Sequence, residues 1–300
     1  MGRIVDYNAA GKTIAASTTV TFTSSDVPSS GVVAYHFGMT GAGNTFNAID
    51  RIRVKANGIV FYDITSALYR SFIERWTNGQ TRYPANQVIN NLSAAGTPVD
   101  WRRFTVPFCM LDYEKHEEAD VVQFPVGSNV TIEIVFNANA GAGSMFCAWT
   151  ETDVHPRAYP KLYSSQMNIA ASNTNARYPF SEDGVIRGFG VETTGLGRAR
   201  LVANGRQIYH AQGQPANSTT VTEDDLVLET EQVFGLPTPA VAAGTAAQDS
   251  SIQDPTWVKI QAGETGSSGR TYFECATTAA WSGATSELGI YAIVPYGKGS

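Results

Sequence analysis

The feature that most constrains this chain is a twelve-residue stretch that occurs twice. Residues 51–62 (RIRVKANGIVFY) and residues 198–209 (RARLVANGRQIY) align without a gap, and six of the twelve aligned residues are identical. Residue 198 follows residue 51 by 147 positions, almost half of the 300-residue chain. Two unrelated windows of this length share about one residue by chance, so the chain is predicted to contain a duplicated domain.

Each copy carries Asn-Gly at its centre, between two runs of residues that favour strands. A type I′ turn requires a positive φ at both central residues, and Asn-Gly meets this requirement better than most pairs. The sequence therefore predicts two β-hairpins, with turns at Asn57-Gly58 and at Asn204-Gly205.

A two-residue turn also predicts which residues face each other. In the first copy it places Val54 opposite Phe61 and Arg53 opposite Tyr62. Cross-strand partners share one face of a sheet, so the apolar pair is predicted to point into a core and the Arg–Tyr pair to point outward. The second copy repeats this plan with the pairs Leu201 and Ile208, and Arg200 and Tyr209.

The residues shared by the two copies have two interpretations. Duplicated binding proteins carry duplicated sites, but an outward Arg packed on Tyr is also common in sheets and contributes about 0.5–1 kcal/mol. We interpret the shared residues as architecture. This structural repeat consists of Arg51, Arg53, Asn57, Gly58, Tyr62, Arg198, Arg200, Asn204, Gly205 and Tyr209.

The composition favours short strands joined by turns. Only 16% of the residues are charged, whereas long surface helices need many charged side chains. A chain of 300 residues suits two domains of about 150 residues each. Two prolines within residues 155–160 interrupt the regular pattern, so we predict a mainly β protein with a first domain at residues 1–160, including an N-terminal arm, and a second domain at residues 161–300. Two jelly rolls or two other sandwiches fit such domains.

Hydrophobic spacing predicts the individual elements. Ile64, Leu68, Phe72 and Trp76 form one helical stripe directly after the first hairpin, so a short helix is expected there. A second, shorter helix is expected at residues 226–234, and surface or subunit-contact loops at residues 86–99 and 236–255. Alternation predicts further strands at residues 13–23, 32–37, 101–110, 121–126, 130–136, 145–150, 184–192, 257–261, 271–276 and 288–294.

Charge and cysteine content exclude several classes of protein. The formal net charge of −6 leaves no basic footprint for nucleic acid, so no direct nucleic-acid partner is expected. The sequence shows neither an apolar run long enough to span a bilayer nor a signal-peptide pattern, so we expect synthesis in a host cytoplasm. Three widely spaced cysteines, Cys109, Cys147 and Cys275, are expected to be buried free thiols.

No catalytic, metal or cofactor signature is present in the sequence. The four histidines, His36, His116, His155 and His210, are dispersed, and His36 and His210 are expected to be hydrogen-bonded structural residues. Glu133 and Glu274 lie in strands of different predicted barrels and are interpreted as solvated side chains. The acidic group at residues 223–229 does not have the spacing of a calcium loop, and Gly188-Phe189-Gly190 is interpreted as a turn and not as a dinucleotide-binding loop.

The order of elements in the first half resembles a known family. Residues 48–58 (AIDRIRVKANG) precede a short strand and then the amphipathic helix that ends near Trp76. This order resembles the double jelly-roll major capsid proteins of membrane-containing icosahedral phages, the corticovirus and tectivirus type. In those proteins a strand of the form I-x-x-I/V-R-V-x-x-x-G likewise precedes a turn and a helix. Residues 198–209 are similar to the equivalent strand, turn and strand of their second barrel.

The resemblance implies a fold and a structural function. It implies two eight-stranded jelly-roll barrels and a homotrimer of near-hexagonal outline, packed against neighbouring capsomers in an icosahedral virion shell. It also implies other virion proteins as partners, such as a vertex protein, and an internal viral membrane that the arm at residues 1–12 approaches. No enzymatic activity and no cofactor are expected. The alternative is a secreted or surface carbohydrate-binding protein with twin β-sandwich domains.

Overall fold

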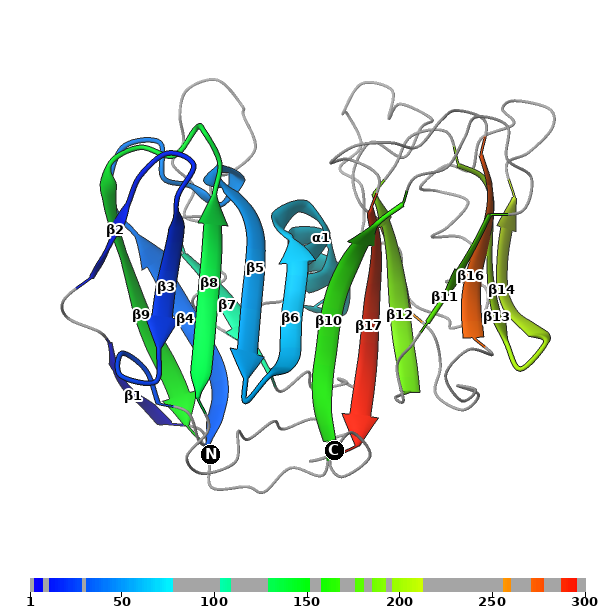
Figure 1. Ribbon diagram of the computed structural model, residues 1–300, viewed down its shortest axis with the longest axis horizontal. Coiled ribbons are helices and arrows are strands. Elements are labelled where there is room, and N and C mark those ends of the chain that lie inside the picture. Colours follow the sequence, from blue (N-terminus) through cyan, green and yellow to red (C-terminus); the bar gives the residue numbers. More distant parts are fainter. Residues whose placement is uncertain are drawn as a thin grey trace. The chain divides into compact units, whose positions relative to one another are not determined.

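The computed structural model describes the parts of the chain at residues 3–7, 11–28, 31–77, 103–108, 129–151, 158–167, 176–180, 185–192, 196–212, 256–259, 271–277 and 287–295. Within them the chain is mainly β, as predicted, with strands β1 to β17, one α-helix and one short 3-10 helix, η1 (Phe46–Ala48) (Figure 1). Several predictions lie outside the described residues: the strand at 121–126, the helix at 226–234, the loops at 86–99 and 236–255, the acidic group at 223–229, and Cys109, His116 and His155.

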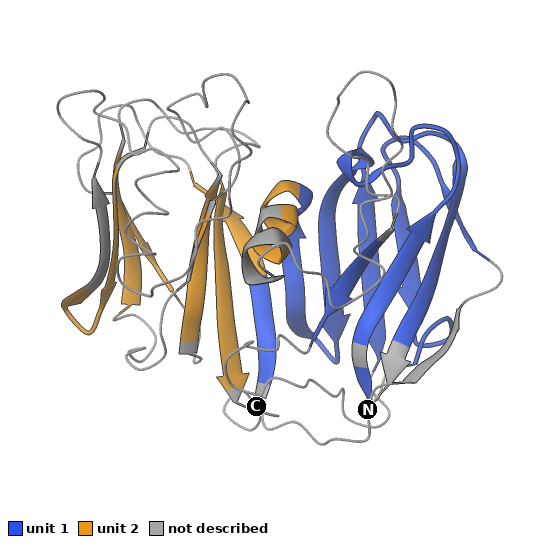
Figure 2. Cartoon of the chain, turned by 180° about the vertical axis from the view of Figure 1, so that it is seen from behind, with its two compact units in different colours: residues 1–66, 80–162 blue, residues 67–79, 163–300 orange. Residues whose placement is uncertain are grey.

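The chain divides into two compact units, coloured separately in Figure 2. Unit 1 contains Met1–Ser66 and Gln80–Leu162, and unit 2 contains Ala67–Gly79 and Tyr163–Ser300. The chain passes from unit 1 to unit 2 inside strand β10 (Ala158–Gln166), which runs through Pro160 without a break. Pro160 therefore does not end the regular structure, because it is accommodated within a strand; Pro156 lies outside the described residues.

Unit 1 is built from two sheets that share one apolar core. The first has the order β1-β9-β4-β7, with β2 paired to β9, and the second contains β6-β5-β8-β3. Phe22 of the second sheet and Phe37 of the first lie 5.8 Å apart between ring centroids, and both are buried. The strands are β1 (Arg3–Tyr7), β2 (Lys12–Ile14), β3 (Thr19–Thr23), β4 (Val32–Met39), β5 (Ile49–Ala56), β6 (Ile59–Thr65), β7 (Arg103–Pro107), β8 (Val130–Phe136) and β9 (Gly143–Glu151).

Strand β8 shows how the sequence pattern produces this core. Ile132, Ile134 and Phe136 are buried, whereas the residues between them are partly exposed, which is the predicted alternation. The prediction of one strand at residues 13–23 was wrong. β2 ends at Ile14 and β3 begins at Thr19, because a turn that contains Ser17, with a φ of 53°, separates them.

Unit 2 is also built from two sheets around a separate core. One contains β15-β12-β17 and the other has the order β11-β16-β13-β14. Phe189 of β12 and Phe273 of β16 lie 5.4 Å apart across this core, which also contains Leu201, Cys275 and Ile290. The strands are β11 (Ala176–Pro179), β12 (Val185–Glu192), β13 (Leu196–Ala203), β14 (Arg206–Gln212), β15 (Thr256–Lys259), β16 (Thr271–Thr277) and β17 (Glu287–Pro295). Gly188-Phe189-Gly190, interpreted as a turn from the sequence, is part of β12.

Helix α1 (Ser66–Thr77) forms where the helical stripe predicted it, but all of it after Ser66 belongs to unit 2. Leu68 and Phe72 are fully buried. The indole Nε1 of Trp257 donates to the carbonyl oxygen of Leu68 at 2.8 Å, and the rings of Phe72 and Trp257 lie 5.0 Å apart. The stripe was correctly interpreted as a core-facing surface, and the core that it faces is that of unit 2.

The Asn-Gly turns of the two hairpins have the predicted conformation. Asn57 and Gly58 have φ values of 49° and 80°, and Asn204 and Gly205 have values of 52° and 78°. All four are in the left-handed region that a type I′ turn requires. A Cβ added to either glycine would meet no atom within 4 Å, so glycine is needed there for its φ and not for space.

The predicted register beyond the turns was wrong by one residue, because each hairpin contains a β-bulge. Ala56 pairs with Ile59 next to the turn, but Val54 pairs with Tyr62 and Arg53 with Asp63. The register shifts between Val54 and Lys55 in the first hairpin, and at the equivalent place, 147 residues later, in the second. There the observed pairs are Leu201 with Tyr209, and Arg200 with His210.

The bulge reverses the predicted orientation of Tyr62. Phe61 and Tyr62 are adjacent and both fully buried, because the extra residue resets the alternation of the strand. The Tyr62 hydroxyl donates to the carbonyl oxygen of Pro107, and its ring lies 5.6 Å from that of Phe108. Tyr62 is therefore a core residue of unit 1 and does not form an outward pair with Arg53.

Candidate functional site: two arginine and carboxylate clusters

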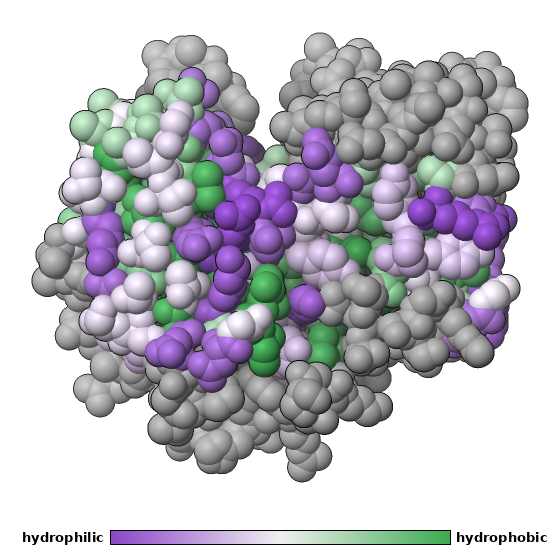
Figure 3. Space-filling view, viewed as in Figure 1, coloured by the Kyte–Doolittle hydropathy of each residue, from purple (hydrophilic) through white to green (hydrophobic). Residues whose placement is uncertain are grey.

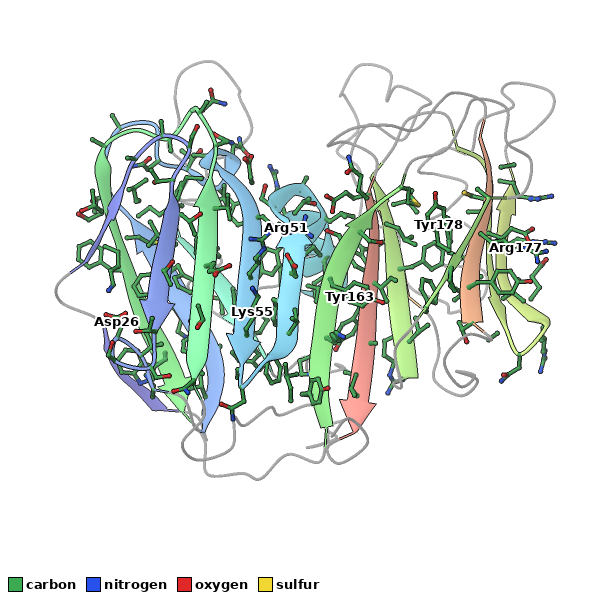
Figure 4. The ribbon with its side chains drawn as sticks, in the orientation of Figure 1. Asp26, Arg51, Lys55, Tyr163, Arg177 and Tyr178 are labelled. Atoms are coloured by element: carbon green, nitrogen blue, oxygen red, sulfur yellow. The ribbon has the colours of Figure 1, made fainter. Side chains whose placement is uncertain are left out.

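The outer face of each repeated hairpin carries a cluster of ionised side chains. In unit 1, Asp63 accepts hydrogen bonds from the Nε atoms of Arg51 and Arg53 at 2.5 and 3.1 Å. Glu133 of β8 lies 3.7 Å from Arg53 Nη1 and 3.8 Å from Lys55 Nζ. These side chains are 22–40% exposed. We call these five residues cluster 1; Arg51 and Lys55 are labelled in Figure 4.

In unit 2 three arginines surround one carboxylate. Arg177 Nε donates to Glu274 Oε2 at 2.7 Å, Arg198 Nη2 lies 3.4 Å from Oε1, and Arg200 Nη2 also donates to Oε1. Glu274 is fully buried, whereas the three arginine side chains are 27–60% exposed. The guanidinium of Arg177, labelled in Figure 4, lies 5.0 Å from the ring centroid of Tyr272. We call these four charged residues cluster 2.

The position of Glu274 determines its protonation state. Burial opposes the ionisation of Glu274. Arg177 and Arg200 favour its ionised form through their hydrogen bonds and positive charge, and this effect outweighs that of burial. The pKa of Glu274 therefore lies below its ordinary value. The carboxylate lies just beneath the exposed arginines and remains ionised at neutral pH. The interpretation of Glu274 as a solvated strand residue was therefore wrong; Glu133 is partly exposed, at 26%.

Strand pairing places the two clusters on equivalent rows of residues. In unit 1, Asp63, Arg53, Glu133 and Thr21 are successive cross-strand neighbours on β6, β5, β8 and β3. In unit 2 the row consists of His210, Arg200, Glu274 and Arg177 on β14, β13, β16 and β11. The duplication thus extends beyond the hairpin to the neighbouring strand that carries the glutamate. A search of the sequence for a predicted strand that contains a glutamate after each repeat could have identified this longer duplication.

Figure 3 shows where these residues lie on the surface of each unit. Strongly hydrophilic atoms gather over β5 in unit 1, and over the region of β11 and β16 in unit 2. Around them the exposed faces of the strands are mixed in character. Charged side chains of both signs on one face of a sheet suit electrostatic contacts with another surface.

The other predicted candidates are in structural settings. His36 Nδ1 lies 2.9 Å from the hydroxyl of Thr105, and burial lowers the pKa of His36 to about 4, so this hydrogen-bonded histidine is neutral at pH 7. Cys147 and Cys275 are buried free thiols, as predicted; burial raises the pKa of Cys275 to about 12. Glu133 and Glu274 belong to different units and are each paired with cations.

Among the residues that the structure describes, no group of three or more His, Cys, Asp or Glu side chains could hold a metal ion. In the same parts of the chain no helix has the length and apolar character needed to cross a membrane. The carboxylates of both clusters are held by guanidinium groups, an arrangement that stabilises charge and fixes geometry.

No protein-family model matches this chain, and no curated protein matches its sequence. The structure is similar to that of the major capsid protein P2 of bacteriophage PM2, with a TM-score of 0.58 and 10% identity over 96% of this chain and 95% of that chain. It is similar to the major capsid protein of Sulfolobus turreted icosahedral virus, with a TM-score of 0.64 and 11% identity over 97% and 96% of the two chains. A chain in the atomic structure of the same virus gives a TM-score of 0.60 and 12% identity over 99% of this chain and 92% of that chain. The resemblance inferred from residues 48–76 is confirmed at the level of the fold: the chain has the double jelly-roll fold of these viral major capsid proteins.

Proposed function

We propose that this chain is a structural protein, the major capsid protein of an icosahedral virus, and that it is located in the virion shell. The observation that carries the proposal is the extent of the structural similarity. It covers 92% or more of both chains in each comparison with the proteins of two different viruses. Similarity of this extent includes both units.

The internal organisation supports the same function. Two units with a duplicated hairpin, a duplicated bulge and equivalent charged rows present repeated surfaces, and repeated surfaces suit packing into a shell of identical copies. In the described parts of the chain the ionised side chains of both clusters are engaged with each other. We propose a role in assembly and not in catalysis.

The finer features of the proposal come from the family that the chain resembles. Residues 1–160 and 161–300 would each form one jelly roll, and three copies would form a capsomer of pseudo-hexagonal outline. Capsomers would contact each other and a vertex protein. The arm at residues 1–12 would face an internal membrane. The structural repeat, Arg51 to Tyr62 and Arg198 to Tyr209, would maintain the two barrels and would not bind a ligand through its turns.

Native mass measurement of the purified full chain tests the trimer directly. We expect a species of three times the chain mass of 32.2 kDa that persists at micromolar concentration. Glycan-array binding tests the alternative of a carbohydrate-binding protein in parallel. A chain that is monomeric at every concentration and binds a defined glycan would contradict the proposal.

A further inference from the structure

The two hairpins share one turn conformation but hold the asparagine of the turn differently. Asn57-Gly58 and Asn204-Gly205 are each preceded by alanine, and the four turn residues have φ values from 49° to 80°. Asn57 and Asn204 are both exposed. Local sequence, backbone conformation and exposure are therefore matched, so a difference in chemical behaviour between the two asparagines must come from their contacts with other parts of the chain.

The first asparagine is fixed by a segment outside its turn. Asn57 Oδ1 accepts from the backbone N–H of Asn129 at 2.8 Å, and the backbone N–H of Asn57 donates to the carbonyl oxygen of Asn129 at 3.2 Å. Asn129 immediately precedes β8, which pairs with β5 of the same hairpin. Both the side chain and the backbone of Asn57 are thus attached to the neighbouring strand.

The second asparagine has no equivalent attachment within the described residues. None of them forms a hydrogen bond with the side chain of Asn204. The strands of this hairpin are paired up to Ala203 and Arg206, on either side of the turn. Opening the turn therefore breaks no side-chain hydrogen bond of Asn204 in the part of the chain that the structure describes.

An Asn-Gly pair carries its own reaction. The backbone nitrogen of the glycine loses its proton to solvent and attacks Cγ of the asparagine. A bond forms between these two atoms, the Cγ–Nδ2 bond breaks, and ammonia leaves with a proton from water. A water molecule then opens the succinimide ring at either of its carbonyl groups, which gives aspartate or isoaspartate. Glycine favours the attack because no side chain covers its nitrogen.

The ring can close only when the turn opens. In a type I′ turn the ψ of the asparagine is about 30°, which places the glycine nitrogen on the side opposite to Cβ. Opening the first turn breaks the two hydrogen bonds between Asn57 and Asn129 as well, whereas opening the second has no such cost. Two hydrogen bonds of ordinary net strength correspond to a rate difference of about 5- to 30-fold.

We propose that Asn204 is a site of spontaneous deamidation in the folded protein, and that Asn57 is protected from the same reaction by its hydrogen bonds to Asn129. The product has a carboxylate at the tip of the hairpin between β13 and β14, and isoaspartate also adds one methylene group to the backbone there. The proposal rests on the contacts of the two turns and does not depend on the proposed capsid function.

Peptide mass spectrometry of the full-length protein follows both asparagines in one sample. Trypsin releases residues 56–70 and residues 201–206, and each of these peptides contains a single asparagine. During incubation of the folded protein in mildly alkaline buffer, we expect Asn204 to be converted to aspartate and isoaspartate about 5 to 30 times faster than Asn57. In urea that unfolds the chain, the two Ala-Asn-Gly sequences should react at nearly equal rates, because the contacts with Asn129 are lost.

Asn129→Pro is the matched variant, because proline has no N–H to donate to Asn57. It should increase the rate of conversion at Asn57 and leave the rate at Asn204 unchanged; if this variant does not fold, the comparison of folded and unfolded wild type decides. Equal or faster conversion of Asn57 in the folded wild type, or a ratio of rates that urea does not reduce, would overturn the proposal. So would a folded protein in which Asn204 stays intact while the unfolded chain converts it.

Discussion

Replacing Glu274 by glutamine would remove the carboxylate that Arg177, Arg198 and Arg200 share. Glutamine keeps the shape of the side chain and one accepting oxygen, but not the negative charge. Glu274 is fully buried, and Arg177 Nε donates to it at 2.7 Å. The variant would leave the three guanidinium groups close together without the carboxylate that they share.

The expected loss of stability follows from the burial of the partners. Removing one member of a fully buried ion pair costs about 3–5 kcal/mol. Here the arginine side chains are 27–60% exposed, so they can turn toward water and recover part of this loss. We expect the free energy of unfolding to fall by about 1–3 kcal/mol, which would lower the urea midpoint by about 0.5–1 M.

Glu133→Gln in unit 1 is the matched control. Glu133 is 26% exposed, its contacts with Arg53 and Lys55 are 3.7 and 3.8 Å long, and Arg53 keeps Asp63 as a partner. The control should cost less than about 1 kcal/mol. Equal losses for the two variants, or no loss for Glu274→Gln, would refute this account of cluster 2.

The difference in stability between the wild type and Glu274→Gln is predicted to depend on pH. The pKa of Glu274 is lower in the folded state than its ordinary value, so its contribution is complete above about pH 5 and is lost as the pH falls through the folded pKa. The difference in urea midpoint between the wild type and Glu274→Gln should therefore be constant near neutrality and disappear in acid. A difference that grows as the pH falls would contradict the assigned direction.

Three further substitutions test other parts of the structure. A Cβ on Gly190 would lie 2.5 Å from the Trp257 indole, so Gly190→Ala should lower the free energy of unfolding by about 1–3 kcal/mol in urea titrations; an unchanged midpoint would show that the indole moves aside. Gly58→Ala meets no atom but keeps a φ of 80°, so it should cost about 1–2 kcal/mol from the backbone alone, and a cost near zero would exclude the type I′ turn. His36 has a pKa of about 4 because it is buried, and it therefore stabilises the fold above about pH 6.5 and loses this contribution between about pH 6.5 and 4, by at most about 3 kcal/mol. His36→Gln should flatten the dependence of stability on pH in that range, and an unchanged slope would contradict the assignment.

Local signals in the sequence predicted the elements whose causes are local. Asn57-Gly58 determines its own turn, and the alternation at residues 130–136 determines which face of β8 is buried. The stripe of Leu68 and Phe72 predicted helix α1. These features depend on residues within a few positions of each other, and the sequence displays them directly.

The bulges and the burial of Glu274 depend on partners that no local pattern identifies. A bulge adds one residue to a strand and leaves the composition unchanged, so Tyr62 was assigned to the wrong face. Glu274 is buried because Arg177 and Arg200, 97 and 74 residues away, bring compensating charge to it. Helix α1 belongs to unit 2 through Trp257, which is 189 residues from Leu68. The spacing of residues in the sequence does not identify partners that are this far apart along the chain.

The proposed function is tested most directly by electron cryomicroscopy of particles purified from a culture that produces this chain. The account predicts icosahedral particles in which this chain is the most abundant protein and forms the shell. The density of each copy should contain two sandwiches, and three copies should surround each local threefold axis. Particles that lack the chain, or a shell built from a different protein, would contradict the assignment of this chain as a major capsid protein.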